Sequence, residues 1–166
     1  MTTSRPDFSQ AATSILTAAG ALFDRLKPQL GRVDLHADHV LEFITEAACY
    51  FLHLHDRTLS MPAFRAERAE IMDGLVVALC NRLQDKLRQL GLTVPIEQTA
   101  DIFLSAYNER QKEYGAFLSQ DWLMQVSLRF GQHAAQACDI PPRGEFALLC
   151  ASQASALYTS LMTSLP

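Results

Sequence analysis

The chain has 166 residues, the length of one ordinary domain and enough to enclose a hydrophobic core. Hydrophobic residues make up 49% and charged residues 19%, which excludes the composition of a disordered chain. The formal net charge is -4, and an acidic chain attracts phosphate backbones poorly, so we expect no nucleic-acid partner.

Four cysteines, Cys49, Cys80, Cys138 and Cys150, lie in apolar stretches without any Cys-x-x-Cys spacing. This pattern argues against a zinc knuckle or a redox pair and is typical of reduced thiols packed inside a cytoplasmic protein. No stretch is apolar enough to predict a membrane span. We therefore expect a cytoplasmic protein with no membrane partner and no cofactor.

Hydrophobic periodicity predicts six helices and no strand, beginning with a helix over residues 7–27. Asp7 is its predicted N-terminal cap, and Pro28 ends it because proline has no amide hydrogen to donate. The second helix is predicted over residues 34–59, with Asp34 as its cap.

A third helix is predicted over residues 61–90, because Pro62 fits the first turn of a helix and Gly91 fits a C-terminal cap. Its buried stripe would be Ile71, Met72, Leu75, Val76, Leu79, Leu83 and Leu87. Pro95 opens the predicted fourth helix, residues 95–117.

The fifth helix is predicted over residues 120–138, capped by Ser119, and the sixth over residues 142–164. The inward residues of the fifth helix would be Trp122, Leu123, Val126, Phe130, Ala134 and Ala137. Short connections fold successive helices back on one another. The sequence therefore predicts an all-α fold, a single antiparallel or orthogonal bundle that forms one domain over residues 1–166.

The most informative polar residues lie on the second helix. At about 100° per residue, six of them fall on one narrow face: His39, Glu42, Glu46, Cys49, His53 and Arg57. Imidazole and carboxylate groups one turn apart can share a metal ion or a proton, so the face could be a metal or acid/base site. The same pattern also fits an ordinary solvated face that carries ion pairs.

Spacing favours the solvated face. Glu46 and His53 are seven residues apart, about 10.5 Å along a helix, which is too far for one ion. His39 with Glu42, and Cys49 with His53, supply only two ligands each. No Glu-x-x-His pair of the di-iron bundle type occurs. These four residues remain the candidate metal ligands, but we predict no metal.

The fourth helix places one arginine in the middle of an aromatic stripe. The stripe consists of Phe103, Ala106, Tyr107, Arg110, Tyr114 and Phe117. Desolvating an unpaired guanidinium is costly, so we predict that Arg110 binds a carboxylate of another helix. The candidate partners are Glu42, Glu46 and Asp56. The hydroxyl of Tyr107 or Tyr114 and the ring of His53 are expected to complete the cluster.

Such a cluster has two interpretations. It is either a structural pin that fixes the register of the helices, or the wall of a pocket in which arginine holds a small anionic ligand. The sequence favours the structural role, and the ligand-binding pocket stays as the alternative interpretation.

The C-terminal segment, residues 146–166, has no charged residue at all. Surface helices normally carry charge on their outer face. A central helix shielded by its neighbours would explain the pattern, and so would a helix that packs against a second subunit. The many hydroxyl and amide side chains argue against a membrane anchor.

No nucleophile motif, phosphate-binding loop or metal-ligand set is recognisable. We therefore predict a non-catalytic interaction or small-molecule-binding module, with homo-oligomerisation through the sixth helix as the candidate assembly. The alternative is a helical-bundle metalloprotein or hydrolase that uses the His/Glu/Cys face of the second helix.

Overall fold

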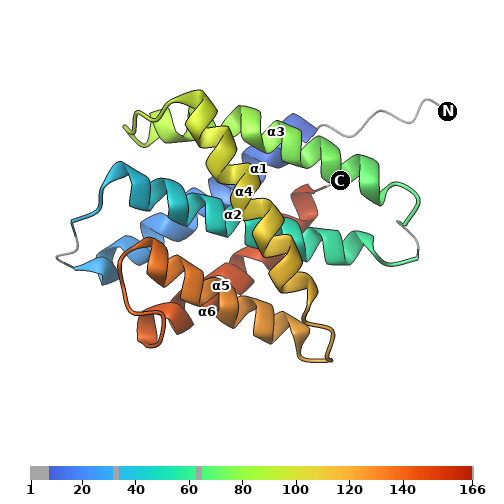
Figure 1. Cartoon of the computed structure of the whole chain (residues 1–166). Helices are drawn as coiled ribbons and strands as arrows, with labels where there is room; N and C mark the ends of the chain where they lie inside the picture. The colour runs from blue at the N-terminus through green and yellow to red at the C-terminus, as the bar shows by residue number, and fades with distance from the viewer. Residues whose placement is uncertain (1–7, 32–33, 63–64, 166) are drawn as a thin grey trace.

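The computed structural model describes residues 8–31, 34–62 and 65–165, and over these ranges it contains six α-helices and no strand (Figure 1). The α-helices are α1 (Phe8–Leu26), α2 (Ala37–Leu59), α3 (Arg68–Gln89), α4 (Ile96–Gly115), α5 (Trp122–Ala137) and α6 (Glu145–Leu161). Two 3-10 helices follow α1 and α6, η1 (Lys27–Leu30) and η2 (Met162–Ser164). The predicted all-α fold class is confirmed.

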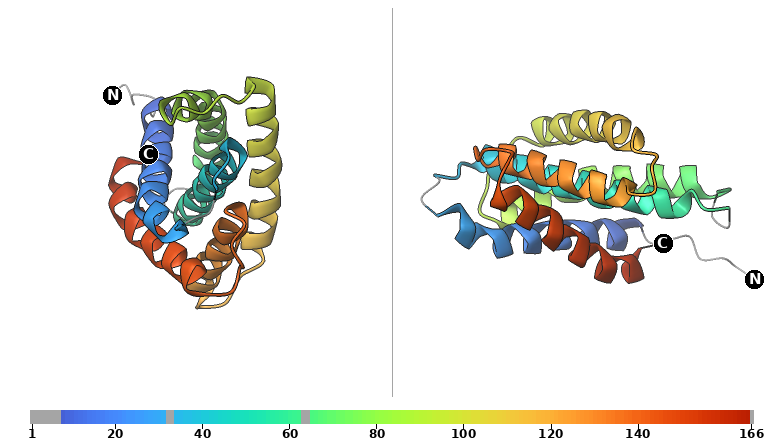
Figure 2. Two further views of the ribbon diagram at one scale, coloured as in Figure 1. Left: turned by 90° about the vertical axis from the view of Figure 1, so that its left-hand side faces the viewer. Right: turned by 90° about the horizontal axis from the view of Figure 1, so that it is seen from below.

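The helices surround α2, which packs against α1, α3, α4 and α5. α4 crosses steeply over one side of α2 and α5, and α1 and α6 lie together on the opposite side (Figures 1 and 2). The arrangement is the orthogonal variant of a bundle, because α4 does not run along its neighbours.

The central position of α2 follows from its composition. Every residue from Phe43 to His55 is buried, as expected for a helix enclosed on all sides. The interpretation of its polar face as solvated is wrong for Glu46, Cys49 and His53, which are buried where α4 and α5 pack on α2, whereas Glu42 on the same face is exposed. The interpretation of the sixth helix as the central one is also wrong: α6 is peripheral, and Leu148, Ser152 and Ala156 are exposed on its outer side.

Three predicted helix starts are wrong by three residues or more: α6 begins at Glu145 rather than at residue 142, and α2 and α3 also begin later than predicted. α2 begins at Ala37 rather than at residue 34, and the N–H of His36 donates a hydrogen bond to Nδ1 of His39 at 3.1 Å. His36 and His39 therefore form the cap of α2 in place of the predicted Asp34. α3 begins at Arg68 instead of residue 61, and Pro62 lies in a turn, a position that proline suits as well as the start of a helix. The predicted cap of α1, Asp7, lies outside the described residues.

The predicted C-terminal cap of α3 is confirmed. Gly91 has φ 74°, and the N–H of Leu92 reaches back to the carbonyl oxygen of Leu87 at 2.9 Å. The start of α5 differs from the prediction, because Ser119 contributes its backbone carbonyl to the N–H of Trp122 and not a side-chain cap. Leu123, predicted to face inward, is 45% exposed.

Candidate functional site

A buried ion pair joins α2 to α4. Nε and Nη2 of Arg110 donate to the two carboxylate oxygens of Glu46 at 2.8 and 2.9 Å. Both side chains are largely buried, 17% and 11% exposed. Burial lowers the pKa of Arg110, but the hydrogen bonds and the charge of Glu46 outweigh burial and raise it. The prediction that Arg110 binds a carboxylate of another helix is confirmed, with Glu46 as the partner.

Glu113, which was not among the candidate residues, connects the Arg110–Glu46 pair to α5. Glu113 accepts a hydrogen bond from Nη1 of Arg110 at 3.2 Å and lies 2.8 Å from Nε2 of His133. It also accepts a bond from Nε of Arg129. Burial alone would raise the pKa of Glu113, and its hydrogen bonds with Arg129 and His133 lower it instead. The i, i+3 spacing of Arg110 and Glu113 was the one available sequence signal.

The other predicted partners lie elsewhere. Asp56 binds Arg68 at the start of α3, with two bonds of 2.7 and 2.8 Å. Tyr107 stacks on Phe103, with ring centroids 6.3 Å apart. Tyr114 is fully buried, but its hydroxyl has no hydrogen-bond partner among the described residues, and burial raises its pKa well above the ordinary value. Asp56, one of the three candidate partners, therefore binds Arg68 instead of Arg110, and the tyrosine hydroxyls form no hydrogen bond with the Arg110–Glu46 pair among the described residues.

His53 belongs to a neighbouring group of bonds rather than to the Arg110 pair. Nε of Arg57 donates to Nε2 of His53 at 3.3 Å, so the proton of the neutral ring must lie on Nδ1. Nδ1 in turn lies 3.1 Å from Oε1 of Gln111 on α4. Burial, as the main cause, lowers the pKa of His53. This geometry fixes a neutral imidazole between two helices.

Arg57 binds the C-terminal end of α4. Its Nη2 donates to the carbonyl oxygens of Tyr114 and Phe117 at 3.3 and 2.7 Å, and its guanidinium lies 5.0 Å from the centre of the Trp122 ring. A cation at a helix C-terminus satisfies carbonyl groups that have no partner within the helix.

The four candidate metal ligands do not converge. His39 lies 3.1 Å from Asp139, His53 binds Gln111 and Arg57, and Glu42 is exposed. Burial raises the pKa of the Cys49 thiol well above its ordinary value. Within the described part of the chain, no three His, Cys, Asp or Glu side chains are grouped so as to hold a metal ion.

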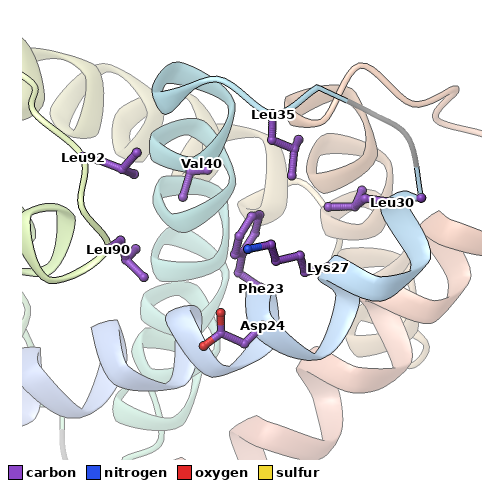
Figure 3. A pocket seen from close by; sticks show the side chains of 9 residues that line it. Phe23, Asp24, Lys27, Leu30, Leu35, Val40, Leu90 and Leu92 are labelled. Atoms are coloured by element: carbon purple, nitrogen blue, oxygen red, sulfur yellow. The ribbon is translucent and has the colours of Figure 1, made fainter.

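A pocket of about 450 Å³ opens between α1, α2 and the end of α3 (Figure 3). Its walls are Phe23, Leu30, Leu35, Val40, Leu90 and Leu92. Two charged residues, Asp24 and Lys27, also line it, and they are exposed and of opposite sign. The pocket therefore offers apolar surface but no buried polar group that would orient a ligand.

A more extended apolar groove, of about 540 Å³, runs between α5 and α6. Its apolar lining consists of Leu123, Met124, Leu128, Leu148 and Ala151. Ser127 and Ser155 add two hydroxyls, each bonded to the buried hydroxyl of Tyr50, at 2.8 and 3.1 Å. The groove thus combines exposed aliphatic side chains with hydroxyl groups that are already paired.

Comparison of the chain with protein-family models, with curated proteins and with solved structures finds no match. None of the helices in the described ranges combines the length and the apolar character needed to cross a membrane.

Proposed function

We propose that this protein is a non-catalytic interaction module, and that it associates with a second copy of itself through the surface formed by α5 and α6. The observation that carries the proposal is the exposed apolar groove between these helices. Leu148 is 58% exposed, Met124 58% and Leu123 45%, and all three line the groove. Contiguous exposed side chains of this size are typical of contact surfaces.

The outer side of α6 supports the proposal. Leu148, Ser152, Ala156 and Ser160 follow one another at intervals of four residues, and all are exposed. Such a row forms a ridge on a helix, and small residues in it allow a second helix to approach closely. The segment from residue 146 to residue 166 carries no charge that would have to be desolvated on contact.

Charge argues for a second copy as the partner. The chain has a net charge of -4, so two copies repel each other unless they meet where charge is sparse. Asp121 is the one charged residue among those that line the groove. A two-fold interface brings a patch against its own copy, and an uncharged patch does so without like-charge contacts.

Sedimentation velocity over a concentration series tests the proposal. We expect the wild-type chain to sediment as a dimer that dissociates on dilution. Leu148→Glu would bury a charge at the interface and should weaken dimerisation by about tenfold or more. Val77→Glu is the matched control, because Val77 is 61% exposed on α3 and lies away from the groove.

Two outcomes would contradict self-association through α5 and α6. One is a wild-type chain that stays monomeric at the highest concentration reached. The other is a dimer that Leu148→Glu leaves unchanged or that Val77→Glu weakens equally. Circular dichroism of each variant checks that the helical fold is retained.

The alternative function, a metalloprotein or hydrolase that uses the polar face of α2, stays a prediction. No specific contact favours it, since His39, Glu42, Cys49 and His53 face different partners or solvent.

A further inference from the structure

A second, smaller pocket lies beside the Arg110–Glu46 pair, between α2, α4 and α5. It has a volume of about 200 Å³. Polar groups from α2, α4 and α5 line one part of it, and Ile102 and Ala106 of α4 line another. The polar lining residues are Glu42, Thr45, Glu46, Arg110, His133 and Gln136.

One buried group in this pocket lacks a partner. Thr45 is 1% exposed, and its Oγ1 has no hydrogen-bond partner among the described residues. Many helical threonines donate back to the carbonyl four residues earlier, as Thr58 does to Leu54 at 3.1 Å. An unsatisfied buried hydroxyl is costly. Thr45 is therefore placed to bind a group that enters the pocket.

The pocket also contains Glu42, a carboxylate that is exposed to solvent. Glu42 makes no hydrogen bond or ion pair with the described side chains that surround it. Partial burial raises its pKa, and the nearby carboxylates of Asp38, Glu46 and Asp139 add to that effect. His39 is the neighbouring group that acts in the opposite direction, and its ring lies 3.1 Å from Asp139.

The guanidinium in the wall of the pocket is not free for an anion. The two Glu46 oxygens occupy Nε and Nη2 of Arg110, and Glu113 occupies Nη1. The small anionic ligand expected from the sequence stays a prediction, and these bonds give it no support. The charged lining residue that forms no ion pair with a described side chain is Glu42, and it is negative.

We infer that this pocket binds the ammonium group of a small primary amine. The ammonium would donate one charge-assisted hydrogen bond to Glu42 and another to the hydroxyl oxygen of Thr45. The alkyl part would lie against Ile102, Ala106 and Ala137, which supply the aliphatic wall. Such a ligand satisfies both unpaired groups and leaves the Arg110–Glu46 pair intact.

Amide NMR on the full chain tests the inference, with n-propylammonium chloride as the probe. We expect saturable shifts for amides of α2 around Glu42 and Thr45, with an affinity in the millimolar range because the ligand is so small. Two comparison titrations, with sodium chloride and with n-propanol, separate ammonium recognition from salt effects and from burial of the propyl chain.

Three variants make the experiment specific. Glu42→Gln should weaken propylammonium binding by about tenfold or more, since it removes the charged acceptor. Thr45→Val, which keeps the shape but removes the hydroxyl, should weaken it by about threefold to tenfold. Glu109→Gln changes the charge by the same amount as Glu42→Gln, but at an exposed position outside the pocket, and should leave binding unchanged.

The inference is overturned if propylammonium causes no saturable shifts. It is equally overturned if n-propanol binds as tightly, or if Glu42→Gln and Glu109→Gln have the same effect. Because Leu148→Glu lies on a different surface, dimerisation and amine binding can fail independently.

Discussion

α5 and α6 cross so closely at Gly131 that no side chain fits between them. A Cβ atom at this position would lie 2.1 Å from the carbonyl oxygen of Ala147 and 2.9 Å from its carbonyl carbon. Non-bonded carbon atoms are best separated by about 3.5–4.0 Å. The obstacle is backbone, which cannot rotate away as a side chain can. Gly131→Ala must therefore push the two helices apart or bend one of them.

The size of the effect follows from two opposing contributions. Inserting a methyl group into a packed site typically costs about 1–3 kcal/mol, and an immovable neighbour places Gly131→Ala at the upper end. Alanine is favoured over glycine inside a helix by about 1 kcal/mol. We therefore expect Gly131→Ala to lower the free energy of unfolding by about 2 kcal/mol. Urea unfolding followed by circular dichroism measures this difference.

Gly20→Ala, in the middle of α1, is the matched control. A Cβ atom at Gly20 would lie 2.6 and 2.8 Å from Cε and Nζ of Lys86, the flexible end of a long side chain. Because that end can swing away, the gain in helix propensity should dominate, and stability should stay level or rise by up to about 1 kcal/mol. If Gly131→Ala proved no more destabilising than Gly20→Ala, the close crossing of α5 and α6 would be refuted.

Two further predictions concern the buried polar groups. Arg110→Met leaves the Glu46 carboxylate buried and unpaired, so we expect the free energy of unfolding, measured in urea, to fall by about 3 kcal/mol. The double variant Arg110→Met/Glu46→Leu should restore most of that loss. Equal losses in both variants would contradict the prediction. The pKa of His53 is lowered by burial from its ordinary 6.5, so below about pH 6.5 the unfolded chain binds a proton that the folded chain does not. Stability should therefore fall as the pH drops from there through the folded pKa, with a slope of up to about 1.4 kcal/mol per pH unit. His53→Gln should flatten that slope in urea unfolding at successive pH values, and an unchanged slope would count against the neutral ring.

The pairing of Arg110 could be predicted because a guanidinium amid aromatic rings has few physical solutions. The acid that Arg110 binds could not be predicted, since Glu42, Glu46 and Asp56 all lie on α2 and differ only in the helical turn that they occupy. The partner of Arg110 depends on the position along α2 at which α4 crosses it. That crossing results from the packing of several helices together and leaves no local signal in the sequence.

The polar face of α2 shows where periodicity alone misleads. A stripe of polar residues normally faces solvent, so a solvated face was the natural prediction. Here other helices cover the middle of the stripe, where Gln111 lies against His53, 58 residues away in the chain. Partners at such separations cannot be paired from one sequence, whereas the cap at Gly91 could be, because its geometry depends only on adjacent residues.

The pairing of each polar group offers a way to distinguish a structural pin from a binding site. The guanidinium of Arg110 is engaged by two carboxylates, so a ligand would have to displace one of them at the full cost of leaving a buried charge unpaired. Beside it, the Thr45 hydroxyl has no hydrogen-bond partner among the described residues, and the exposed Glu42 carboxylate forms no ion pair with them, so a donor that entered would not have to break a bond between two protein groups. We therefore infer that the Arg110–Glu46 pair holds α2 and α4 in register, and that the neighbouring unpaired groups are where a ligand would bind.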